Sequence, residues 1–188
     1  MSRLNILIKR MALALAAMAF AAMPGLADTF NYTGTTVGGP TWNRPVGGQP
    51  PTGLSTFATA VPYSVLQFNV TASGAYDFLS LSNPAEWDNF LVLYVDSFNP
   101  ASPLTNAIVA NDDFPTIGRA GFSAISLTAG TSYFLVTTGF ENIDAGAFAN
   151  SITGPGHVIP GAPIPEPATL ILLSTGLAGV AARLRRRQ

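Results

Sequence analysis

The 188-residue chain contains no cysteine, which excludes disulfides, thiolate zinc sites and cysteine nucleophiles. Between Asp28 and Pro167 two arginines stand against ten acidic residues, a net charge of −8, so nucleic-acid binding, which depends on Lys and Arg, is not expected. With 18 Gly, 15 Pro and 10% charged residues, the composition favours short strands joined by turns over long surface helices.

Residues 1–27 have the layout of a secretory signal peptide. Three basic residues precede an apolar run over 11–22, and small residues lead up to Ala27. We expect a signal helix that exports the chain and is removed by a signal peptidase after Ala27. Cleavage after Ala22, or retention of the segment as an N-terminal membrane anchor, are the alternatives.

Residues 28–156 are expected to form one all-β domain, an antiparallel β-sandwich of the jelly-roll kind. Apolar and polar residues alternate in short segments bounded by turn residues, which is the period-two pattern of strands. The continuous apolar run over 90–95 predicts a central strand covered on both faces. The expected strands lie around residues 30–32, 63–70, 76–79, 90–95, 108–110, 122–127, 133–137 and 147–152.

The proline-rich segment from Gly38 to Gly53 predicts a long ordered loop; loops of this length often bind ligands, and many others only cover the fold. Four aromatic residues have two possible roles. They form a sugar-stacking platform on one face of the domain, or they pack in the core, where their large side chains are buried. The aromatic residues in question are Trp42, Trp87, Tyr94 and Tyr133.

Four oxygen-bearing side chains near strand ends suggest a calcium site. They are Asp88, Asn111, Asp112 and Asp113. Calcium prefers several carboxylate and amide oxygens in a flexible geometry, and an acidic exported domain suits it. The alternative is that Asn111, Asp112 and Asp113 form an ordinary turn while Asp88 caps a strand.

The sequence offers little for catalysis, and we expect that the chain is not an enzyme. Its one histidine, His157, lies in a Gly-Pro-rich loop that suits a Ser-His-Asp triad poorly, and the body has no lysine for Schiff-base chemistry. Paired carboxylates of a glycoside hydrolase remain as the alternative. The candidates for such a pair are Glu86, Asp88, Asp112, Asp113, Glu141 and Asp144.

The C-terminal part is expected to contain a linker over 157–164 and a sorting segment over 165–188. The segment consists of a short motif, an apolar run over 168–182 that predicts a transmembrane helix, and a basic stop. Positive flanks stay in the cytoplasm, so the body lies on the opposite side of the membrane. A buried core helix is the alternative. The motif is Pro165, Glu166 and Pro167, and the basic stop is Arg183, Arg185, Arg186 and Arg187.

This layout resembles the PEP-CTERM sorting signal of Gram-negative bacteria. The resemblance implies that an exosortase, an integral membrane enzyme, reads Pro165, Glu166 and Pro167 and cleaves near them. It also implies export together with extracellular polysaccharide, as in a biofilm. The two prolines hold the tripeptide extended, so that it can lie in the groove of another enzyme.

Residues 60–155 resemble a pre-peptidase C-terminal type β-sandwich. Domains of that type occur on secreted proteins, sometimes bind calcium, and serve adhesion or substrate contact. The short elements that carry the resemblance are Trp87-Asp88-Asn89-Phe90-Leu91, Leu93-Tyr94, Asn111-Asp112-Asp113 and Ala129-Gly130-Thr131-Ser132-Tyr133.

Taken together, these patterns predict an exported binding or structural protein of the cell surface or extracellular matrix. We expect it to be anchored in the membrane before processing, and to meet polysaccharide or a partner protein outside the cell. A secreted carbohydrate-active hydrolase that uses paired carboxylates is the alternative function. A purely structural matrix component with no discrete ligand is a third.

Overall fold

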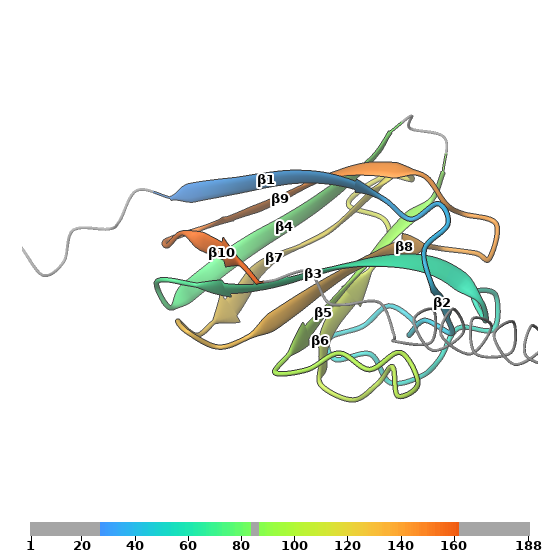
Figure 1. The fold of residues 1–188 in the computed structure, drawn as a ribbon, viewed down its shortest axis with the longest axis horizontal. Helices are drawn as coiled ribbons and strands as arrows, with labels where there is room; N and C mark the ends of the chain where they lie inside the picture. The colour runs from blue at the N-terminus through green and yellow to red at the C-terminus, as the bar shows by residue number, and fades with distance from the viewer. Residues whose placement is uncertain (1–26, 84–86, 162–188) are drawn as a thin grey trace, which may run out of the picture.

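The computed structural model describes residues 27–83 and 87–161, and these form ten strands without an α-helix (Figure 1). The all-β prediction for the body is therefore confirmed. The expected signal helix and transmembrane helix lie outside the described residues. The strands are β1 (Asp28–Thr35), β2 (Thr41–Trp42), β3 (Val61–Val70), β4 (Gly74–Asn83), β5 (Asn89–Val95), β6 (Ala107–Asn111), β7 (Arg119–Leu127), β8 (Tyr133–Gly139), β9 (Ala147–Gly154) and β10 (Val158–Pro160).

The strands form two antiparallel sheets that pack face to face (Figure 1). One sheet has the order β1-β9-β4-β7, and the other has the order β10-β3-β8-β5-β6, with β2 paired to β3. When β2 and β10 are set aside, β1 pairs with β9, β3 with β8, β4 with β7 and β5 with β6. This nested pairing of first with last strand is that of a jelly roll, as the sequence predicted.

Side-chain alternation explains how the sheets meet. In β4, Tyr76 and Phe78 are buried whereas Asp77 between them is exposed, so one face points inward and the other faces solvent. β5 differs, because Leu91 and Leu93 belong to the core between the sheets while Phe90, Val92 and Tyr94 belong to a second core on the outer face. The prediction that this strand is covered on both faces is confirmed.

The cover of the outer face is the loop between β1 and β3. Its residues Trp42 and Ala58 are buried in the second core, packed with β5 residues such as Tyr94. The rings of Trp42 and Tyr63 lie 5.4 Å apart, and those of Trp42 and Tyr94 lie 6.4 Å apart. The long loop predicted over 38–53 is thus an ordered layer of the fold, with β2 and a bridge between Pro45 and Leu54 inside it.

Part of the linker predicted over 157–164 is a strand. Val158–Pro160 forms β10, which pairs with the end of β3 through Val158 opposite Val70. The backbone N–H of Gly161 also donates to the Gln67 carbonyl, at 2.7 Å. Gly and Pro in this segment indicated a linker, but an edge strand tolerates Pro160 because its nitrogen is on the side that faces away from β3.

The sandwich has two distinct ends. At the tail end, Asp28 pairs with Gly154, and β10 lies beside the last residues of β3. At the loop end, the N–H of Thr36 donates to the Gly146 carbonyl. The ten residues of β3 separate the two ends by about 30 Å. The start of β1 and the strand β10 therefore lie far from β2 and the long loop (Figure 1).

Candidate functional site

The loop end carries a pocket centred on Arg44, a residue of the long loop. Hydrogen bonds fix the backbone of Arg44 between two neighbouring stretches, because its N–H donates to the Ala58 carbonyl at 3.1 Å and its carbonyl accepts from Ser55 N–H at 2.9 Å. The loop therefore folds back on itself like a short hairpin. This places the Arg44 side chain against the end of β8, where only 2% of it is exposed.

The guanidinium of Arg44 is held entirely by backbone carbonyls and aromatic rings. Its Nε donates to the Gly139 carbonyl at 3.0 Å, Nη2 to the Phe140 carbonyl at 2.7 Å and Nη1 to the Pro45 carbonyl at 2.8 Å. Its central carbon lies 3.9 Å from the Phe90 ring centroid and 5.0 Å from that of Phe140, which gives two cation–π contacts. Arg44 thus joins the long loop to β5 and β8.

Burial has the largest effect on the pKa of Arg44. Desolvation lowers its pKa from 12.5 to about 10, while the negative charges of Asp112, Asp88 and Asp144 act in the opposite direction. The side chain is still cationic at neutral pH. No carboxylate lies within salt-bridge distance of it in the part of the chain that the structure describes, where the ion pair found is His157 with Asp28.

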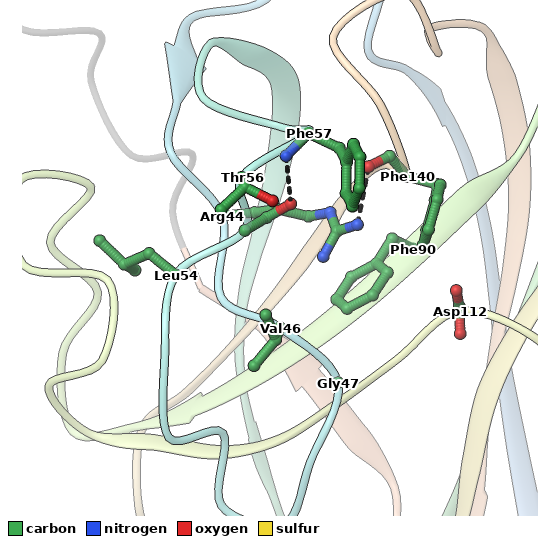
Figure 2. Close-up of a pocket in the computed structure, with 10 residues that line it drawn as sticks. Arg44, Val46, Gly47, Leu54, Thr56, Phe57, Phe90, Asp112 and Phe140 are labelled. Atoms are coloured by element: carbon green, nitrogen blue, oxygen red, sulfur yellow. Dashed lines mark hydrogen bonds between the residues drawn. The ribbon is translucent and has the colours of Figure 1, made fainter.

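The pocket has a volume of about 280 Å³ and mixes apolar with polar walls. Phe57 and Leu54 stand at its side with 64% and 41% of their surface exposed. Arg44 lies at its centre, surrounded by Phe57, Phe90 and Phe140, and Asp112 lies beyond Phe90 (Figure 2). The arrangement suits a small ligand with one apolar face and several hydrogen-bonding groups.

The acidic residues singled out for calcium lie at this same end. The pKa of Asp88 is raised from 3.8 to about 6, first by burial and then by repulsion from Asp144, Asp112 and Asp113, while Arg44 lowers it. One oxygen of Asp88, Oδ1, is buried without a hydrogen-bond partner in the described structure. The structure therefore brings the three predicted carboxylates into electrostatic range of one another.

The fourth predicted ligand, Asn111, turns its amide nitrogen onto backbone carbonyls. Nδ2 donates to the Gly121 carbonyl at 2.7 Å and to the Asp113 carbonyl at 3.3 Å. Within residues 27–83 and 87–161, no group of three or more acidic, histidine or cysteine side chains is arranged to hold a metal ion. Because calcium also takes amide and backbone oxygens, the site at Asp88, Asn111, Asp112 and Asp113 stays a prediction.

The remaining residues predicted from the sequence lie elsewhere in the fold. The aromatic residues proposed as a stacking platform are buried in the cores, so that reading is wrong; they are Trp42, Trp87, Tyr94 and Tyr133. His157 lies at the tail end, where its Nδ1 is 2.8 Å from Oδ2 of Asp28. Glu86 lies outside the described residues. Phe57, the exposed aromatic residue of the pocket, gave no sequence signal beyond its place after the proline-rich loop.

The terminal segments are judged from sequence alone. Ala27 is the first described residue and is exposed, directly before β1. The motif Pro165, Glu166, Pro167 and the arginines Arg183, Arg185, Arg186 and Arg187 lie outside the described residues. Among the residues that are described, none belongs to a helix of the length and apolarity needed to cross a membrane.

The fold and the tail define an all-β sandwich protein with a C-terminal sorting segment. Residues 163–187 match the PEP-CTERM protein-sorting motif family, so the chain carries this motif, as the sequence resemblance implied. A PEP-CTERM motif indicates an exported protein that an exosortase processes at the membrane and that reaches the cell surface. A comparison with curated proteins gave no match.

Three solved structures illustrate what the sandwich is similar to. Yersinia pseudotuberculosis-derived mitogen is 13% identical, with 74% of this chain and 100% of that chain covered and a TM-score of 0.40. The pre-peptidase C-terminal domain of Bacillus anthracis collagenase is 17% identical, with 66% and 88% covered and a TM-score of 0.37. A family 35 carbohydrate binding module from an environmental isolate is 16% identical, with 72% and 98% covered and a TM-score of 0.38.

Proposed function

We propose that this chain is a non-enzymatic binding or structural protein of the cell surface or extracellular matrix, released into that role by exosortase processing. The observation that carries the proposal is the PEP-CTERM sorting motif over residues 163–187. The sandwich is the part that acts outside the cell. The signal peptide over 1–27 and the membrane helix over 168–182 serve export and temporary anchoring.

The boundary between sandwich and motif supports this proposal. The last strand of the described residues ends at Pro160, and the matched motif begins at residue 163. Cleavage near Pro165, Glu166 and Pro167 therefore removes no strand and no core residue of the described domain. A folded sandwich can be released intact, which a sorting substrate requires.

The pocket at the loop end supports binding over catalysis. Asp112 is the one carboxylate among the described residues that line it, whereas glycoside hydrolysis uses two carboxylates about 5 to 9.5 Å apart. One observation favours the hydrolase alternative, because the raised pKa of Asp88, about 6, suits a general acid. Hydrolysis of a polysaccharide that Asp88→Asn abolishes would establish that alternative instead.

Mass measurement of the mature protein tests the proposal. In cells with an exosortase, we expect the chain to lose residues 1–27 and the arginine tail and to appear at the surface or in the medium. In cells without the enzyme, and in a variant with alanine at Pro165, Glu166 and Pro167, the tail should remain. A wild-type chain that keeps its tail in both strains, or that stays in the cytosol, contradicts the proposal.

A further inference from the structure

The pocket around Arg44 suggests what the sandwich binds. We propose that it holds one unit of a neutral polysaccharide, with Phe57 as the stacking surface, with Asp112 and Thr56 as partners of the sugar hydroxyls, and with the buried Arg44 holding the walls of the pocket in place. This inference rests on the proposed function, because it names the ligand of the exported binding domain.

The walls of the pocket match the two kinds of surface on a sugar ring. A hexose presents an apolar face of C–H groups and an edge of hydroxyls. The exposed ring of Phe57 and the half-exposed side chain of Leu54 offer the apolar face a partner, while Asp112 and Thr56 offer polar groups. A volume of about 280 Å³ is at the lower end of small-molecule sites, so it admits one unit of a chain and leaves its neighbours outside.

Hydrogen bonds arrange the pocket before any ligand arrives. The hydroxyl of Ser55 accepts from the N–H of Phe57 at 3.1 Å and from that of Ala58 at 3.0 Å, which fixes the turn that presents the Phe57 ring. The N–H of Ala60 donates to Asn142 Oδ1 at 2.8 Å and holds the end of the loop. Such preorganisation reduces the entropy lost on binding.

Asp112 and Thr56 provide the polar groups of the pocket, and Arg44 holds its walls together. An arginine has five N–H donors, and the described structure uses three of those of Arg44 for backbone carbonyls. The terminal nitrogen that points toward Val46 and Phe90 is Nη1, which donates to the Pro45 carbonyl, so Arg44 supports the wall of the pocket (Figure 2). Asp112 is acceptor-only when ionised and the hydroxyl of Thr56 can donate or accept, so these two side chains can satisfy both the O–H and the lone pairs of sugar hydroxyls.

Charge selects a neutral sugar over an acidic one. Asp112 lines the pocket, and Asp88 and Asp144 are close enough to influence the same arginine. The carboxylate of a uronic acid would meet these negative charges, and the acidic body would repel a polyanionic chain over a Debye length of about 10 Å. A neutral polysaccharide meets no such repulsion.

The position of the pocket fits this use. It lies at the loop end, about 30 Å along β3 from the tail end, where the chain leads into the sorting motif. A sandwich attached through its tail end therefore holds the pocket away from the attachment point, where a matrix polymer can reach it.

Binding measurements on the full-length chain, purified in a detergent without a sugar headgroup, test this inference. Immobilised dextran, mannan and galactan serve as neutral probes and alginate as the polyuronate probe, with a chelator present so that no metal bridges the ligand. We expect binding to at least one neutral polymer and about tenfold weaker binding to alginate. Phe57→Ala should weaken neutral binding at least tenfold, because it removes the exposed ring without touching a core.

Two further variants make the result decisive. Ile159→Ala shortens an exposed apolar residue in β10 at the tail end and should bind as the wild type does. Asp112→Asn should weaken binding to the neutral polymers and leave binding to alginate weak. Stronger binding to alginate by this variant would assign an anionic ligand and overturn the proposal. Equal binding by Phe57→Ala, or no binding to any neutral probe by a folded chain, also overturns it. A chain that is sorted and processed normally yet binds none of them refutes this inference and leaves the proposed function standing.

Discussion

Replacing Arg44 with methionine should lower the free energy of unfolding, and the contacts of Arg44 give the size of this effect. The change removes three hydrogen bonds from a cation to backbone carbonyls, which together contribute about 6 kcal/mol at about 2 kcal/mol each. Burial opposes this, because lowering the pKa of Arg44 from 12.5 to about 10 costs about 3 kcal/mol. The free energy of unfolding should therefore fall by about 3 kcal/mol.

Thermal and denaturant unfolding measure this loss, and the fluorescence of Trp42 and Trp87, both buried, reports on it. For a domain of about 130 residues, 3 kcal/mol corresponds to a fall in Tm of about 10 °C. The matched control is Arg119→Met, since the Nε of Arg119 donates a single exposed hydrogen bond to the Phe114 carbonyl. A Tm for Arg44→Met within about 2 °C of this control would refute the reasoning.

The remaining predictions concern Asp88 and calcium. The pKa of Asp88 is about 6 in the folded chain against 3.8 as its ordinary value, so the folded state binds the proton more tightly and loses stability as the pH rises from about 4 to about 6. In a chelating buffer at pH 7.5, Asp88→Asn should raise the free energy of unfolding by about 1 kcal/mol, a figure reduced because Asp88 is partly exposed. At pH 4 the same substitution should have no effect. Equal effects at both pH values would contradict this prediction. If calcium binds at Asp88, Asn111, Asp112 and Asp113, adding it at pH 7.5 should raise the Tm of the wild type and not that of Asp88→Asn. Superimposable wild-type curves with calcium and with chelator would exclude the site.

The strands were predictable because their signal is local. Alternation along β4 follows from a sheet with one face inward, and the continuous apolar run of β5 follows from burial on both faces. β2 and β10, with two and three residues, are too short to carry a period. Each is defined by its pairing with β3, a contact that the local sequence does not encode.

The pocket was less predictable because its residues meet only through long-range contacts. Arg44 was visible as one of two basic residues of the body and lay in a loop predicted to be long and ordered, yet its partners Gly139 and Phe140 are about 95 positions away along the chain. The acidic residues were recognised because turn residues at strand ends carry a compositional signal. An exposed phenylalanine such as Phe57 carries no such signal.

The jelly-roll pairing itself bears on export. Since β1 runs antiparallel to β9, the first strand begins at Asp28 beside Gly154, where the last long strand ends. β10 then pairs with β3 at the same end, and His157 lies against Asp28. A signal peptide before Asp28 and a sorting motif after Gly161 would therefore leave the sandwich from one side. Both connections are at the tail end, about 30 Å along β3 from the pocket at the loop end.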